Sequence, residues 1–361
     1  MDSTAAIGIL GGYGAVGTAV VRRLYRAGVG PLLVAGRDPA RAEASVESLG
    51  ATSTAVRAQA VDLWDASLDA FLARCRLVVN CAGPSYRVLD TVARAALRHG
   101  VDYVDAAGDD PLHARLRAQG GADEWAAASR TAVLSAGALP GLSGLLPRVL
   151  LDQVARPIRL EGYLGGVASL TPAAAGDVLL ARGPEHGIPS AAWEDGQTRD
   201  RALEPRRGLR LPAFPQPVTA FPFLSTEAVR LARAARIRRV HWYTVFGGEH
   251  LAEELAMAWA MDDTETAGLV RAAEADVRRH GSWYGQEFRL WNGTDDGPPT
   301  RTLTLRAEDS YELSGFLSAT AAHHVLAGHV KPGVHFAADV LDPLSTVQTL
   351  ATDPVAELDM A

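Results

Sequence analysis

Ile7-Gly8-Ile9-Leu10-Gly11-Gly12-Tyr13-Gly14-Ala15-Val16-Gly17 links a short aliphatic run to the start of an amphipathic segment. Three of its glycines match G-x-G-x-x-G, and each has its own task. Gly12 permits a tight turn, Gly14 lets the backbone approach a pyrophosphate, and Gly17 lets the helix pack closely on the strand. The phosphates of a dinucleotide would then lie at the positive, N-terminal end of that helix. We therefore expect a strand–turn–helix unit that binds a dinucleotide through Gly12, Tyr13, Gly14, Ala15, Val16 and Gly17.

The chain up to Pro140 repeats this order of short apolar run and longer amphipathic segment, which is typical of a parallel α/β sheet. The runs predict six strands, at Ala6–Gly11, Leu32–Ala35, Ala58–Val61, Leu77–Cys81, Tyr103–Asp105 and Ala132–Ser135. Five helices are expected between them, at Ala15–Ala27, Pro39–Leu49, Ser67–Ala73, Arg87–His99 and Pro111–Arg130. Six strands with five crossovers make a doubly wound Rossmann sheet, so the fold class is α/β.

After Pro140-Gly141 the regular alternation ends, which indicates a second, mixed α+β domain. Strands are expected at Leu160–Leu164, His241–Phe246, Gln286–Trp291 and Arg301–Leu305, with the last two joined as an antiparallel pair by a loop from Asn292 to Pro299. The Gly-, Pro- and charge-rich stretch from Arg182 to Pro222 predicts an irregular surface excursion. A helix is expected from Ser314 to His329, followed by a short tail and a mobile acidic terminus.

The composition is that of an ordinary globular protein. Hydrophobic residues make up 48% and charged residues 21% of 361 positions, enough for two domains. The formal net charge of −7 argues against a nucleic-acid-binding protein. Two cysteines, Cys75 and Cys81, are too few for a disulfide framework and indicate a reducing compartment. Since the first residues lack the basic segment of a signal peptide and no apolar run has the length of a membrane helix, we expect a cytoplasmic protein.

The end of the second expected strand, Ala35-Gly36-Arg37-Asp38, decides which nicotinamide cofactor fits. Sheets that bind NAD place an acidic residue near this point, where it bonds the ribose 2′-hydroxyl. Arg37 lies 20 residues after Gly17 (37 − 17 = 20) and can instead pair with the 2′-phosphate of NADP(H), with Arg41 as a second contact. In the alternative, Arg37 is solvated and Asp38 binds the ribose. We favour NADP(H).

Two further strand ends supply candidate cofactor contacts. Asp62 follows the third strand and is expected either to contact the adenine amine or to cap the next helix. The fourth strand ends at the switch point of the sheet, where the nicotinamide would lie. The small residues there, Cys81, Ala82, Gly83 and Pro84, would let the backbone touch the ring, and a nucleophilic Cys81 is the less favoured alternative. Tyr86 either covers the nicotinamide or fills the core.

These residues resemble the saccharopine dehydrogenase-like NADP-binding family. The likeness rests on Gly11–Gly17, Ala35-Gly36-Arg37, Val79–Pro84, Tyr103-Val104-Asp105, Leu139–Ser143, Tyr163–Gly166, Gly333-Val334 and Leu341-Asp342-Pro343. The resemblance implies an oxidoreductase of amino-acid or secondary metabolism. It also implies a Rossmann domain of residues 1–140 that is completed by residues 314–361. The inserted residues 141–313 would then bind the substrate and form a homodimer.

The single lysine, Lys331, narrows the catalytic chemistry. Four residues before it stands Ala327, so the Tyr-x-x-x-Lys pair of short-chain dehydrogenases is absent, as are a P-loop lysine and a thiolate cluster for zinc. Tyr103 and Asp105 share one face of the fifth strand, at the carboxyl edge where ligands bind. A buried Asp105 beside the nicotinamide could carry a raised pKa and, with Tyr103, move protons. Alternatively, Asp105 caps the loop that follows.

The second domain offers Tyr163 and His250 as substrate contacts, which would face Tyr86 across the expected cleft. His250 follows Gly247-Gly248 and opens a helix, so an ordinary helix-start role is the alternative. Four further histidines lie along one helix and its exit without nearby carboxylate or thiolate partners, and we therefore expect no metal site: His323, His324, His329 and His335.

The sequence as a whole predicts an NADPH-dependent reductase that acts on a C=N, C=O or activated C=C bond of a small-molecule substrate. Two other classes of function stay open. One is an NADP(H)-binding sensor or scaffold without turnover, and the other is a non-redox enzyme that regenerates its bound cofactor. Neither a nucleic acid nor a membrane is an expected partner.

Overall fold

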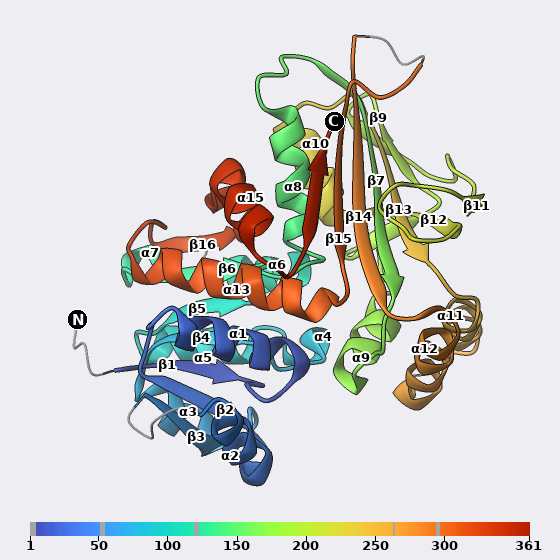
Figure 1. Cartoon of the computed structure of the whole chain (residues 1–361). Helices are drawn as coiled ribbons and strands as arrows, with labels where there is room; N and C mark the ends of the chain where they lie inside the picture. The colour runs from blue at the N-terminus through green and yellow to red at the C-terminus, as the bar shows by residue number, and fades with distance from the viewer. Residues whose placement is uncertain (1–4, 51–54, 119–122, 263, 294–296) are drawn as a thin grey trace. The chain divides into compact units, whose positions relative to one another are not determined.

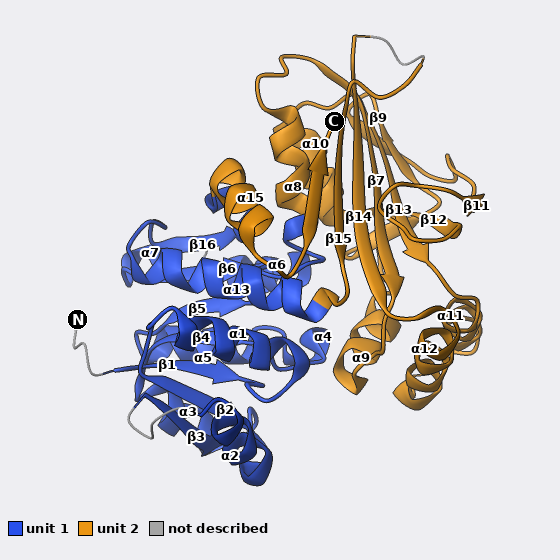
Figure 2. Ribbon diagram, in the orientation of Figure 1, with its two compact units in different colours: residues 1–142, 311–341 blue, residues 143–310, 342–361 orange. Residues whose placement is uncertain are grey.

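The computed structural model describes residues 5–50, 55–118, 123–262, 264–293 and 297–361 (Figure 1). The chain divides into two compact units, which Figure 2 shows in different colours. Unit 1 comprises residues 1–142 and 311–341, and unit 2 comprises residues 143–310 and 342–361. The chain therefore leaves the first unit, builds most of the second, returns to complete the first, and ends in the second.

Unit 1 is built on a seven-stranded parallel sheet. Its strands are β1 (Ala6–Leu10), β2 (Leu32–Gly36), β3 (Val56–Ala60), β4 (Cys75–Asn80), β5 (Asp102–Asp105), β6 (Thr131–Leu134) and β16 (Gly333–Phe336). Their order is β16-β6-β5-β4-β1-β2-β3, so the direction of winding reverses between β1 and β4. This order confirms the doubly wound sheet, and β16 completes it from the C-terminal part of the chain.

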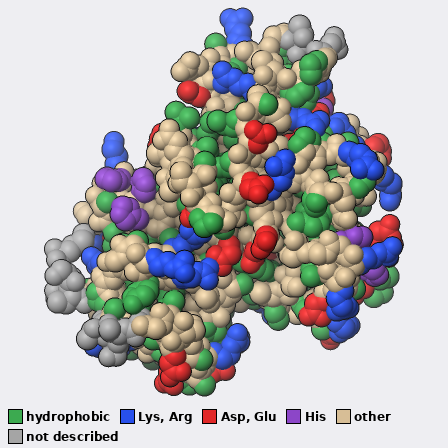
Figure 3. All heavy atoms as spheres, in the orientation of Figure 1, with side chains coloured by type: hydrophobic (Ala, Val, Ile, Leu, Met, Phe, Trp, Pro, Cys, Tyr) green, Lys and Arg blue, Asp and Glu red, His purple; other side chains and the backbone are tan. Residues whose placement is uncertain are grey.

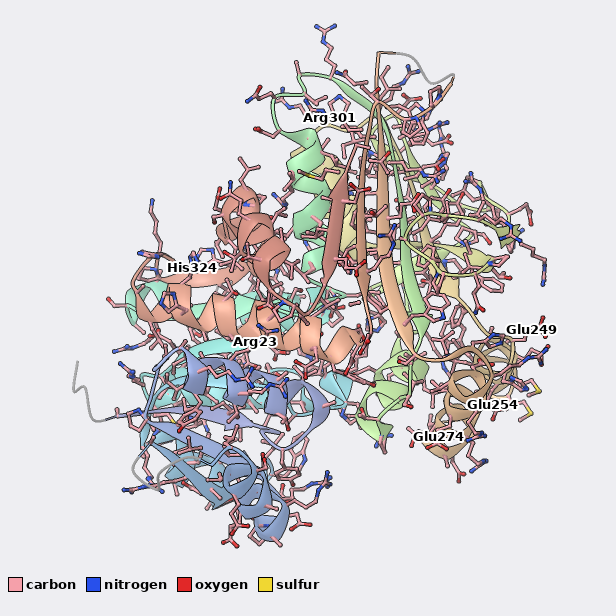
Figure 4. The ribbon with its side chains drawn as sticks, viewed as in Figure 1. Arg23, Glu249, Glu254, Glu274, Arg301 and His324 are labelled. Atoms are coloured by element: carbon pink, nitrogen blue, oxygen red, sulfur yellow. The ribbon has the colours of Figure 1, made fainter. Side chains whose placement is uncertain are left out.

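Helices cover this sheet, as Figure 1 shows. They are α1 (Ala15–Arg26), α2 (Pro39–Ser48), α3 (Ala66–Leu72), α4 (Ser85–Val88), α5 (Thr91–Arg98), α6 (Asp110–Ala118), α7 (Asp123–Ala127), α13 (Ser310–Leu326) and α14 (Ala337–Val340). Apolar side chains of α3, α5, α6 and α7 pack with strand residues in one buried cluster. Helix α13 lies against α1, because a Cβ on Gly315 would come within 2.3 Å of the Ala19 Cβ. Arg23, labelled in Figure 4, places its guanidinium 5.3 Å from the Phe316 ring.

One of the expected helices is interrupted in the structure, and another is described only in part. The segment Arg87–His99 contains α4 and α5 in place of one helix, because Leu89 has a φ of +45° that no helix can continue through. The segment Pro111–Arg130 contains α6 and α7, and residues 119–122 of that prediction lie outside the described residues. Apolar residues lie on both sides of Leu89, so hydrophobic periodicity did not indicate this break.

Unit 2 is built on a mixed sheet with the strand path β10-β9-β13-β7-β14-β15-β17. These strands are β7 (Pro157–Val167), β9 (Ala192–Glu194), β10 (Gln197–Arg199), β13 (Arg239–Phe246), β14 (Trp283–Asn292), β15 (Arg301–Ala307) and β17 (Glu357–Met360). Strands β7 and β13 are parallel, whereas β14 and β15 form the expected antiparallel pair. Residues 294–296 of the expected loop between them lie outside the described residues. The helices of the unit are α8 (Leu142–Leu151), α9 (Pro172–Leu180), α10 (Thr226–Ala234), α11 (His250–Ala260), α12 (Thr266–His280) and α15 (Pro343–Thr352).

Two expectations about this part of the chain are wrong. The stretch Arg182–Pro222 is not irregular, since it contains β8 (Gly187–Pro189), β9, β10, β11 (Arg206–Leu209) and the start of β12 (Val218–Ser225). The C-terminal residues are also not a free tail of the Rossmann domain. Strand β17 pairs with β15, with Leu358 opposite Leu305, so residues 342–361 belong to unit 2. Within the described residues, no helix has the length and hydrophobicity to cross a membrane.

Candidate functional site

The glycine turn after β1 has the geometry that a dinucleotide site requires. Gly11 takes the left-handed backbone conformation at φ +69°, so the positive φ falls one residue before Gly12. A Cβ on Gly12 would lie 2.8 Å from the Ile9 carbonyl oxygen, and one on Gly17 would lie 2.1 Å from the Gly11 oxygen. These glycines therefore close the turn and seat α1 against it. On Gly14 a Cβ would meet only the Gly11 oxygen, at 3.1 Å, which leaves space beside the backbone.

The start of α1 is open toward an anion. Its N-cap residue is Gly14, so no side chain bonds to the first N–H groups of the helix. Ala15 is exposed and Val16 is half-buried, and neither side chain carries a charge. The partial positive charge of the helix N-terminus and its N–H groups are therefore available to a phosphate, as the spacing of the glycines predicts.

The carboxyl end of β2 presents two arginines. Arg37 is exposed and forms no hydrogen bond or ion pair with any residue that the structure describes. Asp38 is the N-cap of α2, where its carboxylate accepts the Arg41 N–H at 3.1 Å. The Asp38 side chain is thus turned toward the helix, which favours Arg37 over Asp38 as the contact for the ribose end of the cofactor.

Asp62, which follows β3, was expected either to contact the adenine amine or to cap the next helix, and the structure excludes the second role. Its carboxylate accepts the backbone N–H of Trp64 at 3.0 Å, forming a tight turn. The N-cap of α3 is Asp65, which accepts the Ser67 N–H at 2.8 Å. Asp62 is therefore not the helix cap, and its contact with the adenine amine stays a prediction. The Val61 N–H donates to the Gly36 carbonyl at the end of β2, at 2.9 Å. Asp62 is the next residue and therefore lies near the end of β2.

The end of β4 lies beside the glycine turn at the switch point of the sheet. The Cys81 N–H donates to the Leu10 carbonyl at 2.9 Å, and a Cβ on Gly11 would lie 2.7 Å from the Cys81 oxygen. The Gly83–Pro84 peptide bond is cis. Burial, together with the charge of Asp105, raises the pKa of the Cys81 thiol above its ordinary range. A thiol that resists ionisation is a poor nucleophile, so Cys81 fits the lining role.

Tyr103 and Asp105 form a closed hydrogen-bonding group with Asn80. One Asp105 oxygen accepts the N–H groups of Ala107 and Gly108, at 3.0 and 2.7 Å. The other accepts the Asn80 amide at 3.0 Å and the Tyr103 hydroxyl. Burial and the neighbouring carboxylate raise the pKa of Tyr103 well above its ordinary value.

This closed group changes the role we assign to the pair. Asp105 is 2% exposed and Tyr103 is fully buried, so neither side chain presents a surface to a substrate. With both carboxylate oxygens occupied, Asp105 caps the loop after β5, as the structural alternative held. The expectation that Tyr103 and Asp105 are catalytic is not supported, because sequence spacing showed their shared face but not the donors that surround them.

Tyr86 lies on α4, two residues after the cis proline Pro84 in the segment that follows β4. Its hydroxyl donates to the Asp109 carboxylate at 2.8 Å, and its side chain is half-buried. Asp109 precedes α6 and was not recognised from the sequence. The pattern Asp109-Asp110-Pro111 is typical of a helix start, and its pairing with Tyr86 depends on how β4 and β5 end side by side.

Unit 2 places Tyr163 in its core. Tyr163 has no exposed surface, and its ring stacks on Tyr243 with centroids 4.9 Å apart. Its hydroxyl donates to Glu161 at 2.8 Å and accepts from Arg206. Burial opposes ionisation of Glu161, but the His241 ring 3.4 Å away, the hydrogen bond from Tyr163 and the charge of Arg206 outweigh it and lower the pKa of Glu161 to about 2. The structure corrects the expectation of a substrate contact: Tyr163 is part of a buried polar network.

His250 begins α11 and is held there by Asp276 of α12. Asp276 is buried and accepts the N–H groups of His250 and Leu251, and it lies 2.7 Å from the His250 ring Nδ1. His250 thus has the helix-start position that was the alternative to a substrate contact. Its ring also lines a surface pocket with Glu253, Glu254, Met257, Gly268, Arg271 and Ala272. Glu254, labelled in Figure 4, lies on α11 beside α12. Contact between His250 and a substrate stays a prediction.

Three histidines gather at the C-terminal end of α13. The rings of His323 and His324 have centroids 6.3 Å apart, and those of His324 and His329 are 5.4 Å apart. Figure 3 shows histidine side chains grouped on this face. Within the described part of the chain, no set of three or more His, Cys, Asp or Glu residues is arranged to hold a metal ion.

Comparisons with known proteins agree with this geometry. Residues 7–133 match the family described as the saccharopine dehydrogenase NADP binding domain, which confirms the resemblance and the nicotinamide cofactor for that segment. No curated protein sequence matches the chain. Among solved structures, saccharopine dehydrogenase (L-Glu forming) from Saccharomyces cerevisiae is 17% identical, with 99% of each chain covered and a TM-score of 0.70. A probable dehydrogenase from Thermotoga maritima is 10% identical, with 96% of this chain and 94% of that chain covered and a TM-score of 0.49. The yeast likeness shows the fold.

Proposed function

We propose that the protein is an NADPH-dependent oxidoreductase, and the premise is that residues 7–133 match the saccharopine dehydrogenase NADP binding domain family. The observation that carries the proposal is the open phosphate site at the start of α1. Gly14 leaves space at the backbone, the helix N-terminus has no side-chain cap, and Arg37 stands unpaired among the described residues at the neighbouring strand end. These features fit a pyrophosphate and a 2′-phosphate, respectively.

When bound, NADPH supplies a hydride to an electron-poor carbon, so we propose that the substrate carries a C=N, C=O or activated C=C bond. The small residues Cys81 to Pro84 would leave the nicotinamide ring close to the backbone at the switch point of the sheet. Tyr86 lies two residues after Pro84, and its hydroxyl donates to the Asp109 carboxylate at 2.8 Å. Since Tyr103 and Asp105 are closed off, we propose Tyr86 as the unit 1 side chain that contacts the substrate.

The test follows the absorbance of NADPH at 340 nm with a panel of imines, ketones and activated alkenes. We use NADPH that carries deuterium at the transferred position, and the product is analysed by mass spectrometry. The proposal expects NADPH consumption that depends on one class of acceptor and one deuterium in the product. Matched controls are the Gly14→Val variant, which should consume no NADPH, and wild type with NADH.

Two results would contradict the proposal. Product formed without net loss of NADPH would indicate a non-redox enzyme that regenerates its cofactor. Tight binding of NADPH with no turnover on any acceptor class would favour a sensor or scaffold.

A further inference from the structure

Tyr13, the residue between two glycines of the turn, lies against the end of β2. A Cβ on Gly36 would come within 2.4 Å of the Tyr13 ring, so the ring fills the space that a side chain at position 36 would take. The Tyr13 hydroxyl accepts the backbone N–H of Asp38 at 2.9 Å. The ring is therefore held at both its face and its tip, beside the strand end where the cofactor's ribose is expected.

The Arg41 side chain rests on this ring. Its guanidinium carbon lies 4.7 Å from the ring centroid, within the range of a cation–π contact. The Arg41 backbone N–H donates to the Asp38 carboxylate at 3.1 Å, which fixes the first turn of α2 beneath it. Arg41 is exposed and forms no ion pair with an acidic side chain in the described part of the chain. The guanidinium is thus oriented but not neutralised.

These contacts place an oriented cation on Tyr13, whose hydroxyl also accepts the N–H of the residue after Arg37. Arg37 precedes Asp38, whose N–H is bonded to Tyr13, and Arg41 sits on the same tyrosine. A dianionic phosphate is recognised by paired arginines, and an arginine already held in place loses less conformational entropy on binding. A ligand such as AMP, which has no 2′-phosphate, should not bind more tightly because of this arrangement.

We infer that Tyr13 is a positioning residue for cofactor choice: its ring holds Arg41 where the 2′-phosphate of NADP(H) binds beside Arg37. The inference rests on the proposed function, because it assumes that the glycine turn binds this cofactor. Tyr13 acts only through Arg41, so removing the ring costs affinity for the 2′-phosphate and leaves the rest of the cofactor unaffected.

The test uses two small probes that separate the 2′-phosphate from the rest: adenosine 2′,5′-bisphosphate and AMP. Both are titrated calorimetrically against the full-length wild type, Tyr13→Leu, Tyr13→Phe, Arg41→Ala and the Tyr13→Leu/Arg41→Ala double variant. Arg26→Ala is the matched control, since Arg26 is exposed at the far end of α1, roughly 16 Å away by helix rise. Melting curves of every variant check that the fold is intact.

Arg41→Ala should weaken binding of the bisphosphate by roughly ten- to a hundredfold, the size of one charge-assisted hydrogen bond. Tyr13→Leu should weaken it by roughly three- to fivefold, as expected for loss of an exposed cation–π contact, and Tyr13→Phe by less. Affinity for AMP should stay within about twofold throughout, given the size of ordinary distant effects. In the Arg41→Ala background, Tyr13→Leu should have no further effect, because the guanidinium it holds is gone.

Three outcomes overturn the inference. Multiplying losses in the double variant would mean that Tyr13 does not act through Arg41. Equal losses for AMP and the bisphosphate would mean that Tyr13 shapes the glycine turn. Unchanged bisphosphate affinity in both Tyr13 variants, while wild type prefers the bisphosphate, would mean that Arg41 needs no partner. By contrast, a wild type that binds neither NADPH nor the bisphosphate would refute the proposed function itself.

Discussion

Replacing Gly14 with valine should abolish cofactor binding while leaving the stability of the fold nearly unchanged. Gly14 has φ −78° and ψ 173°, an extended conformation that valine adopts readily. Its new Cβ would meet only the Gly11 oxygen, at 3.1 Å, so the free protein needs an adjustment of a few tenths of an ångström. A β-branched side chain is less favourable than glycine at an N-cap, but it also restricts the unfolded chain. The two effects should leave the stability within about 1 kcal/mol of wild type.

The effect on cofactor binding should be much larger. The valine methyl groups would stand where a pyrophosphate approaches the N–H groups at the start of α1. Losing two hydrogen bonds to a charged phosphate costs about 3–6 kcal/mol, at about 1.5–3 kcal/mol each. Since about 1.4 kcal/mol is tenfold in an equilibrium constant, NADPH should bind on the order of 10²- to 10⁴-fold more weakly.

Gly17→Ala provides the contrasting variant. Its Cβ would lie 2.1 Å from the Gly11 oxygen and 2.7 Å from the Gly12 Cα, so the start of the helix must move away from the turn. We expect this overpacking to reduce the free energy of unfolding by at least about 2 kcal/mol. The alanine at position 17 should thus lower the melting temperature more than the valine at position 14.

The assay pairs thermal melting with a titration that follows the increase of NADPH fluorescence on binding. Gly14→Val should melt within about 4 °C of wild type and bind no measurable NADPH at concentrations that saturate wild type. Unchanged NADPH affinity in Gly14→Val would refute the reasoning, because the glycine turn would then be structural only. A large loss of stability in this variant would also contradict the space that the structure shows at Gly14.

Three further predictions concern buried and partly buried groups. Asp105→Ala leaves four donors without their acceptor and should lower the free energy of unfolding in urea by at least about 3 kcal/mol. A variant that is stable but inactive would instead indicate that Asp105 is catalytic. The pKa of Glu161 is about 2 in the folded protein, below its unfolded value of 4.5. The ionised carboxylate therefore stabilises the fold above pH 4.5 by about 3 kcal/mol, and this contribution is lost as the pH falls toward 2. Glu161→Gln should therefore flatten the decline in urea stability between pH 6 and pH 3 relative to the exposed control Glu274→Gln, and parallel declines would be inconsistent with the shift. Tyr86→Phe keeps the ring but removes the hydroxyl on Asp109, so kcat should fall by about tenfold or more with little change in NADPH affinity, and an unaltered kcat would exclude a contact with the reacting group.

The Rossmann half of the chain could be predicted because its determinants are local. Alternating apolar runs and helices, the three glycines and the arginine after β2 all lie within short windows of sequence. The observed strands differ from the expected ones by one or two residues at their ends. The family resemblance implied that the C-terminal part of the chain completes the domain, but the strand β16 was not predicted. It joins the sheet beside β6 from a distant part of the chain, after most of unit 2 has been built.

The parts that could not be predicted depend on contacts between distant segments. The acidic C-terminus forms β17 because β15 offers it an edge, which its own composition does not indicate. Between Arg182 and Pro222, glycine and proline separate short strands that sheet pairing stabilises. The side chain of Asp105 could be placed at a strand end, but one of its four donors, the Asn80 amide, comes from another strand. Likewise, the burial of Tyr163 follows from Arg206 and Tyr243, which belong to other strands much later in the chain.

The most direct measurement is the affinity of NADPH and NADH for wild type and for Arg37→Ala and Arg37→Asp. Arg37 is exposed and unpaired among the described residues, so its removal should not disturb the fold. One charge-assisted contact to the 2′-phosphate contributes about 1.5–3 kcal/mol, so Arg37→Ala should weaken NADPH by roughly ten- to a hundredfold and leave NADH unchanged. Arg37→Asp should weaken NADPH further and improve NADH. Equal losses for the two cofactors, or wild type that binds NADH as tightly as NADPH, would contradict the account.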